Sequence, residues 1–251
     1  MSLSRRKLIT TGLAAAAGAT GLAAADRLAR RYGLIPPDSA GIYGPGETLT
    51  YAAQRLLASH SFAREFPRSM ISAAPFLNET SPLTDNFKRQ QAHGFSDWRL
   101  TVDGAVAHTA SFSVADLRAL GRRSQITEIA CEEGWSYIAE WIGTPLSAVL
   151  RETGILPHAR YIVYFSDQPD WWESIDMPEA LHPQTVLAWG MNDADLPVGF
   201  GGPLRMRVAR QLGYKNVKYI TRITATDSLK PFGKGLGSAS PEAGYAWYAG
   251  I

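Results

Sequence analysis

The chain of 251 residues contains a single cysteine, Cys131, which lies between an apolar stretch and a turn signal. A lone cysteine has no partner for an internal disulfide, so a disulfide scaffold is excluded. The pattern over 125–131 predicts a strand, and the following Glu132-Glu133-Gly134 predicts a turn that leaves the thiol at the end of that strand. A thiolate there can be held at the rim of a cavity, whereas a cysteine without chemistry is usually a small buried hydrophobe.

Three uses of this sulfur differ in the neighbours they require. A structural zinc site needs several Cys or His ligands at close spacing, and none is near Cys131. A hydrolytic cysteine–histidine pair stays open, with His93 or His182 as the base, although no nucleophile-elbow pattern surrounds the cysteine. A metal that brings most of its own ligands would need only one protein thiolate.

Apolar periods indicate a helix-and-loop extension followed by a domain of short elements. A helix is expected from Thr48 to about Ser59, with Thr48 or Thr50 as its cap, and the stretch 66–94 is expected to be irregular. Strands are expected at 98–104, 125–131, 161–165, 204–208 and 219–225, helices at 113–121, 145–153 and 177–181, and a strand or helix end at 185–189. This mixture predicts an α+β fold.

The N-terminal residues have the order of an export leader. The paired arginines Arg5 and Arg6 stand in a head, residues 4–9, that precedes the uncharged run 10–25, and this run closes with three alanines. The run is shorter than the ~20 apolar residues that a helix needs to cross a bilayer. This length favours a cleaved twin-arginine signal peptide over an uncleaved anchor. The expected location is therefore the periplasm. The expected division is a signal peptide at 1–25, an extension at 26–94 and a packed domain at 95–251.

Composition limits the class of protein. Hydrophobic residues at 45% and charged residues at 19% are typical of globular chains, and the net charge of +2 includes the cations of the leader. The sequence has no basic stripe and no recognition motif for nucleic acid, so nucleic acid is not expected as a partner.

The residues around the cysteine resemble the molybdenum-binding segment of the sulfite oxidase superfamily. This resemblance rests on 131–136 and 140–146, and the periplasmic branch that includes protein-methionine-sulfoxide reductases is the most similar. Further blocks agree in order and spacing at 180–185, 191–197, 202–205 and 212–220. The resemblance covers about 95–227 and implies a mixed α+β sulfite-oxidase-type fold, with 95–251 as the molybdopterin-binding domain.

The resemblance also implies a cofactor and the residues that hold it. Cys131 would supply the single protein thiolate to one molybdenum atom, with the other sulfurs coming from the dithiolene of one molybdopterin. Arg205 matches a cofactor-binding arginine suited to a phosphate, and Asn216-Val217-Lys218 matches a loop that wraps the cofactor. Ser166 falls where the family uses a small hydroxyl side chain, and Asn78 matches an asparagine that contacts the pterin.

Some positions depart from the family pattern. Phe200 stands near the place where some relatives have an asparagine, so one polar cofactor contact is lost or replaced by backbone. Glu132 and Glu133 replace an Arg-rich segment that binds an oxyanion in sulfite oxidases, and two carboxylates disfavour sulfite. His182 either orients the pterin or caps a turn. Oxygen-atom transfer such as sulfoxide reduction is the expected reaction; the alternatives are sulfite oxidation, a cofactor-free binding domain and the cysteine hydrolase.

Substrate and electron partner are the least defined features. The stretch 167–173 is expected to be a specificity loop, in which Trp171 and Trp172 line a groove for an apolar or thioether-bearing substrate, either small or protein-bound. The sequence has no Cys-x-x-Cys-His heme-attachment motif, so no heme is expected. Electrons would then cross to or from a separate partner, for which a membrane heme protein is the natural candidate.

Overall fold

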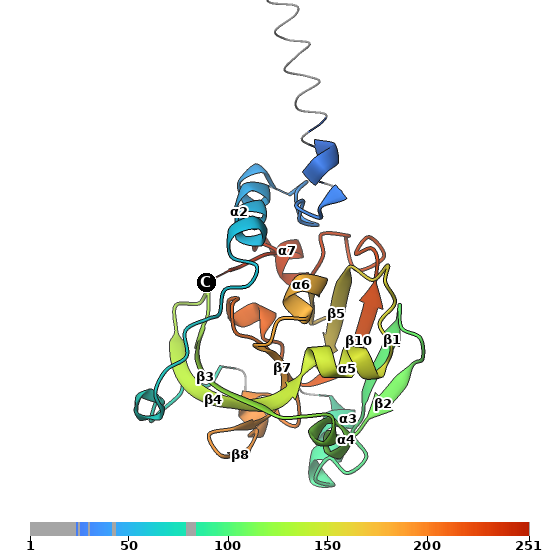
Figure 1. The fold of residues 1–251 in the computed structure, drawn as a ribbon. Coiled ribbons are helices and arrows are strands. Elements are labelled where there is room, and N and C mark those ends of the chain that lie inside the picture. Colours follow the sequence, from blue (N-terminus) through green and yellow to red (C-terminus); the bar gives the residue numbers. More distant parts are fainter. Residues whose placement is uncertain (1–23, 25, 30, 42–43, 79–83, 251) are drawn as a thin grey trace, which may run out of the picture.

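The computed structural model describes residues 24, 26–29, 31–41, 44–78 and 84–250, so the predicted signal peptide lies almost entirely outside the described residues. Within the described part, the strands form two sheets (Figure 1). The first sheet has the order β2 (Ala110–Phe112), β1 (Leu100–Gly104), β10 (Ile220–Thr226), β5 (Tyr161–Ser166) and β6 (Trp172–Asp176). The second has β3 (Arg123–Ala130), β4 (Ser136–Pro145), β7 (Thr185–Met191) and β8 (Ala194–Asp195), with β9 (Arg205–Val208) also paired to β7. Strands β1 and β10 are parallel and the other pairs are antiparallel.

The main hydrophobic core draws residues from both sheets. Leu100 and Ile223 of the first sheet and Leu187 and Met206 of the second are completely buried in one cluster. Helix α5 (Leu146–Glu152) packs three of its residues into the same cluster. The mixed α+β prediction is confirmed.

Local signals in the sequence account for the short helices. Ser113 caps α4 (Val114–Ala119), because its side chain accepts from the Asp116 amide while the Asp116 carboxylate accepts from the Ser113 amide. Gly154 follows α5 with φ of +68°, a conformation that favours glycine after a helix. Helix α6 (Met177–Ala180) is the predicted helical turn, and Asp176 caps it.

The stretch 66–94 is not irregular throughout, which corrects the sequence prediction. It contains the 3-10 turn η1 (Arg68–Met70) and helix α3 (Asp85–Ala92). Thr84 caps α3 by accepting a hydrogen bond from the amide of Phe87. Phe87 is the one buried residue of α3, so this helix has no apolar period that could reveal it.

Helix α2 (Gly44–Leu57) begins earlier than the predicted start at Thr48. Thr48 lies inside the helix, where its hydroxyl donates to the Gly44 carbonyl at 2.7 Å, so neither Thr48 nor Thr50 is the cap. The apolar residues whose spacing predicts this helix face outward, whereas Tyr51 is buried against the domain.

Three short helical elements complete the described part of the chain. They are η2 (Val198–Phe200), η3 (Gly213–Lys215) and α7 (Ala239–Glu242). Among the residues that the structure describes, no helix has the length and apolar character needed to cross a membrane.

Candidate functional site

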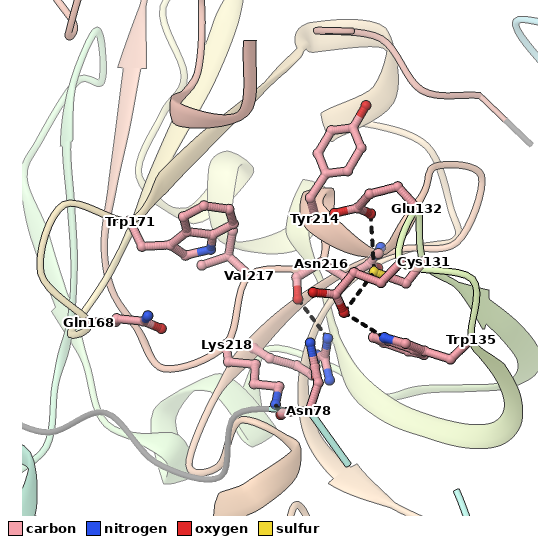
Figure 2. Close-up of a pocket in the computed structure, with 13 residues that line it drawn as sticks. Asn78, Cys131, Glu132, Trp135, Gln168, Trp171, Tyr214, Asn216, Val217 and Lys218 are labelled. Carbon is pink, nitrogen blue, oxygen red and sulfur yellow. Dashed lines mark hydrogen bonds between the residues drawn. The ribbon is translucent and has the colours of Figure 1, made fainter. Parts of the chain in front are cut away.

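A pocket between the two sheets contains the cysteine (Figure 2). Cys131 and Trp135 lie on one side of it, while Gln168 and Trp171 lie on the other. Its lining comprises Asn78, Cys131, Glu132, Glu133, Trp135, Gln168, Trp171, Arg205, Gly213, Tyr214, Asn216, Val217 and Lys218.

The end of β3 places Cys131 as the sequence predicts. The strand stops at Ala130, and the Cys131 amide then donates to the Trp135 carbonyl at 2.9 Å. The Gly134 amide donates back to the Cys131 carbonyl at 3.1 Å, and Gly134 has φ of +90°, which a glycine adopts without strain. This tight turn fixes the thiol at the wall of the pocket without distorting a strand.

The surroundings of the thiol do not activate it as a free nucleophile. The Cys131 thiol donates to Glu132 Oε2 at 3.1 Å, and Trp135 Nε1 donates to Glu133 Oε2 at 2.7 Å. Burial, assisted by the neighbouring carboxylate of Glu132, raises the pKa of the Cys131 thiol to about 12. The thiol therefore stays protonated at neutral pH unless a cation replaces its proton.

Neither candidate histidine belongs to this pocket, whose lining residues include no histidine. His93 is the C-cap of α3. His182 is buried with its ring packed on Phe62, and its Nδ1 accepts a hydrogen bond from the Gln184 amide at 3.2 Å. Of the two roles considered for His182, this contact is the capping of a turn. The geometry therefore does not form the cysteine–histidine pair that the hydrolase alternative requires.

The chain passes very close to the sulfur at η3. A Cβ atom added at Gly213 would lie 3.0 Å from Cys131 Sγ and 3.1 Å from Cys131 Cβ. Only glycine therefore lets this turn approach the cysteine without moving it.

Strand β9 places two arginines beside the pocket with no carboxylate to balance them. Arg205 donates to the carbonyls of Phe200 at 2.8 Å and Asn216 at 2.6 Å. Arg205 and Arg207 both lie over the ring of Trp141, at 5.0 Å and 5.5 Å from its centroid. Within the described part of the chain, neither forms an ion pair and the Nε of each has no hydrogen-bond partner.

This burial leaves positive charge that lacks a counterion. Burial, followed by the charge of Arg205, lowers the pKa of Arg207 to about 9, and burial also lowers the pKa of Arg205. An uncompensated buried charge is costly, and a bound anion would relieve that cost. Arg205 lines the pocket, so the electrostatics of the wall favour an anionic ligand.

A network of hydrogen bonds holds the loop after η3. Asn216 Oδ1 accepts from Arg207 at 2.8 Å and from the Val208 amide at 2.8 Å. Lys218 Nζ donates to the Gly199 carbonyl at 2.9 Å and also to the Asn78 carbonyl. The loop is thereby fixed to β9 and to the segment that carries Asn78.

The residues singled out from the sequence divide into two groups. The pocket lining includes Asn78, Cys131, Trp171, Arg205, Asn216, Val217 and Lys218, whereas Ser166, Phe200 and Trp172 lie outside it. Ser166 stabilises the loop 216–218 from outside the pocket, because its hydroxyl donates to the Lys218 carbonyl at 2.9 Å. Phe200 acts through its carbonyl, which holds Arg205 in place of the expected polar side chain.

The two neighbouring tryptophans are separated by the start of β6. Trp171 precedes the strand and lines the pocket. Trp172 belongs to the strand and packs on Phe165 and Phe232, with ring centroids 6.3 Å and 6.1 Å away. Only Trp171 is therefore placed to meet a substrate.

Several residues at the site were missed by the sequence argument. Arg207 lies two positions after Arg205 in a strand, so the two side chains share a face, and this spacing is a signal that could have revealed it. Trp135 belongs to the cysteine segment itself. Gly213 and Tyr214 lie in the motif block 212–220 and Gln168 lies in the predicted specificity loop 167–173, but none of the three was singled out as a site residue.

The donor set fits the cofactor that the resemblance implies. Among the described residues, no group of three or more His, Cys, Asp or Glu side chains forms a metal site. A metal at Cys131 would therefore take its remaining ligands from a cofactor, and a soft thiolate suits molybdenum with sulfur ligands. The guanidinium of Arg205 and the ammonium of Lys218 both line the pocket and suit the phosphate of a pterin.

Comparisons with known proteins agree with this site. The model of the oxidoreductase molybdopterin binding domain matches residues 87–231. The chain is 35% identical over 195 residues to the putative protein-methionine-sulfoxide reductase subunit YedZ1 of Azospira oryzae, an alignment that covers 78% of this chain and 70% of that protein. It is also 30% identical over 169 residues to the protein-methionine-sulfoxide reductase catalytic subunit MsrP of Ralstonia nicotianae, with 61% and 50% covered.

Two further matches extend this picture. The chain is 29% identical over 161 residues to MsrP of Xanthomonas campestris, and it spans half the length of either MsrP relative. The crystal structure of the sulfane dehydrogenase SoxCD of Paracoccus pantotrophus is similar with a TM-score of 0.51 and 23% identity, covering 53% of this chain and 39% of that one. This likeness shows a shared fold. The matched residues 87–231 include Cys131 and make up more than half of the chain. The chain therefore belongs to the oxidoreductase molybdopterin binding domain family of the sulfite oxidase superfamily.

Proposed function

We propose that this chain is the catalytic part of a molybdopterin-dependent oxidoreductase that reduces sulfoxides by oxygen-atom transfer. The observation that carries the proposal is one pocket with a single thiol, Cys131, on one wall and the unneutralised guanidinium of Arg205 on another. A soft metal ligand and an anion site thus face the same space. The relatives named as protein-methionine-sulfoxide reductases support the choice of reaction.

The thiol, the two cationic side chains and the loop backbone of the pocket would each bind a different part of the cofactor. Cys131 would bind molybdenum, and binding a cation would offset the burial that keeps this thiol protonated. Arg205 and Lys218 would hold the anionic end of the pterin, and backbone groups at 216–218 would hold its polar edge. When bound, the cofactor supplies two-electron redox chemistry at a metal that exchanges oxygen atoms.

The two carboxylates beside Cys131 would determine which substrates can enter the pocket. Conversion of a sulfoxide takes up two electrons and two protons and yields a thioether and water. Glu132 and Glu133 stand next to Cys131 and would repel the sulfite anion, whereas an uncharged sulfoxide meets no such barrier. Trp171 and Trp135 offer apolar surface for the methyl and methylene groups of a thioether side chain.

The electron supply and the location complete the proposal. Electrons would come from a separate partner, with a membrane heme protein as the candidate, since the sequence has no heme-attachment motif of its own. The paired arginines and the uncharged run 10–25 would export the folded protein to the periplasm by the twin-arginine route.

The test combines metal analysis with a substrate screen. The full chain is produced with its leader intact in a molybdenum-replete host, and molybdenum is measured per chain. A reduced dye then supplies electrons for the reduction of sulfoxides and N-oxides, and in a separate assay an oxidised dye accepts electrons from sulfite. We expect about one molybdenum per chain and turnover of sulfoxides in preference to sulfite. A metal-free protein would indicate a binding domain of the same fold, and preference for sulfite would contradict the assigned reaction.

A further inference from the structure

Helix α2 turns its apolar stripe away from the protein. Leu49, Ala53, Leu56 and Leu57 follow the i, i+4, i+7, i+8 spacing that normally marks the core-facing side of a helix. In this structure Leu49 is 73%, Leu56 is 66% and Leu57 is 87% exposed.

Polar anchors fix the helix in this orientation. The Tyr51 hydroxyl donates to Asp176 at 2.6 Å, and Arg55 forms ion pairs with Asp176 at 2.6 Å and Glu179 at 3.3 Å. Arg55, Asp176 and Glu179 have buried side chains in these pairs. Turning the helix to bury its leucines would separate these buried charges, which is strongly unfavourable. The outward stripe is therefore a property of the folded state.

The exposed apolar surface continues onto neighbouring segments. We use the name α2 face for the large exposed side chains of Leu28, Tyr32, Leu49, Leu56, Leu57 and Phe62. Tyr32 and Leu56 line the same cavity of about 650 Å³, which joins the two segments. In Figure 1 the segment before α2 and the helix itself lie at the same end of the molecule. Exposed apolar patches of this kind mark surfaces that contact a partner or a membrane.

The charge around the α2 face is mostly positive. Residues 27–37 and 48–64 contain five arginines and no Asp or Glu, and Asp26, Asp38, Glu47 and Glu65 directly flank these ranges. Arg27, Arg31 and Arg64 are exposed, whereas Arg55 is used in the buried ion pairs. Exposed leucines and aromatic residues beside an excess of arginines over carboxylates are the composition of a surface that binds anionic lipid.

We propose that the α2 face lies on the surface of an anionic lipid bilayer. Its leucines and aromatic rings would enter the interfacial region, and Arg27, Arg31 and Arg64 would meet lipid phosphates. The predicted leader ends a few residues before Leu28, so cleavage there would leave this face at the start of the mature chain. None of the residues of the α2 face lines the Cys131 pocket, so bilayer contact leaves the pocket free.

Vesicle flotation of the full chain tests this surface. Vesicles of phosphatidylcholine alone are compared with vesicles that also contain phosphatidylglycerol. The unsubstituted chain is expected to float with the anionic vesicles, and Leu56→Glu with Leu57→Glu is expected to weaken that binding roughly 10-fold or more. Arg27→Glu with Arg31→Glu, which keeps every leucine, is expected to weaken it as well, and added salt to lower it in the unsubstituted chain.

A matched control separates the α2 face from general hydrophobicity. Met70 is 46% exposed in η1, outside the α2 face, so Met70→Glu is expected to float like the unsubstituted chain. All substituted side chains are exposed, and the melting temperature of each variant checks that folding is intact. The proposal is overturned by equal binding of the unsubstituted and leucine-substituted chains, by equal binding to neutral vesicles, or by binding only to vesicles that hold a membrane protein.

Discussion

The guanidinium of Arg207 donates a hydrogen bond of 2.8 Å to the side-chain carbonyl of Asn216, and this contact ties strand β9 to the loop that faces the cofactor pocket. The same oxygen accepts from the Val208 amide, and Asn216 Nδ2 donates to the carbonyls of Gln211 at 3.2 Å and Leu212 at 2.9 Å. A single buried amide thus holds the shape of the loop and supplies one of the acceptors of the buried Arg207 guanidinium, which also donates to Val208, Thr127 and Glu128.

Asn216→Ala should destabilise the protein and weaken cofactor retention together. The substitution leaves buried donors and acceptors without partners, which costs about 2 to 4 kcal/mol of unfolding free energy. Urea denaturation measures the loss, and the molybdenum content of the purified variant measures retention. Asn86→Ala is the control, because Asn86 is exposed on α3 and its loss should cost less than about 0.5 kcal/mol. A stable Asn216→Ala variant with full molybdenum would argue against this role.

Gly213→Ala should displace the sulfur while leaving the fold in place. The added Cβ would lie 3.0 Å from Cys131 Sγ, so the side chain has to shift by a few tenths of an ångström. We expect kcat to fall about 10-fold or more, because small misplacements of reacting groups cost rate, with little change in melting temperature. Gly46→Ala is the matched control, since a Cβ there meets no atom within 4 Å. Equal kcat in the two variants would be evidence that the turn does not position the thiol.

The neighbouring tryptophans should give opposite phenotypes. Trp171→Ala removes a wall of the pocket and should raise KM for a sulfoxide without lowering the molybdenum content. Trp172→Ala removes a ring from the cluster with Phe165 and Phe232 and should cost about 3 kcal/mol of stability with KM unchanged. Steady-state kinetics and thermal unfolding of both variants make the comparison. An unchanged KM in Trp171→Ala would remove this residue from the substrate site.

The stability of the protein should fall with acidity because of His182. Burial lowers the pKa of this imidazole from 6.5 to about 4. Its unfolded form therefore binds a proton at a higher pH than its folded form does, so the stabilisation is complete above pH 6.5 and is lost as the pH falls toward 4.

Replacement by an uncharged side chain isolates this effect. Between pH 6.5 and pH 4 the unfolding free energy of His182→Gln should fall by about 2 kcal/mol less than that of the unsubstituted protein. Denaturant titrations at a series of pH values, run in parallel on both proteins, measure it. Parallel curves would mean that another group controls the acid response.

The sequence predicted the strands well where burial is one-sided or where charged residues mark the ends. Strands β3, β5 and β10 were predicted from their apolar patterns, and the position of Cys131 follows directly from the end of β3. Strand β4 was not predicted, although Tyr137, Ile138, Trp141 and Ile142 have high β-propensity, because it is buried along most of its length and so shows no clean alternation, and Gly143 and Pro145 interrupt its pattern.

Two other features depend on tertiary structure that no local pattern records. Leu49 and Leu56 give α2 its helical period, yet buried ion pairs of Arg55 with a distant helix turn that stripe outward. Arg205 and Arg207 alternate with apolar residues as a solvated face would, yet both are buried on the ring of Trp141. Arg205 was predicted from its place in the family motif at 202–205 and not from the alternation along the strand. That motif ends before Arg207 and therefore did not mark it.

The sulfur coordination of molybdenum shows whether Cys131 binds the metal. X-ray absorption of the purified holoprotein and of Cys131→Ser, both produced with molybdenum bound, reports the sulfur ligands of the metal. We expect the serine variant to keep its cofactor through Arg205 and Lys218, to lose one sulfur ligand per molybdenum and to lose sulfoxide reduction. The same sulfur coordination in both proteins would show that Cys131 does not bind the metal and would contradict the account.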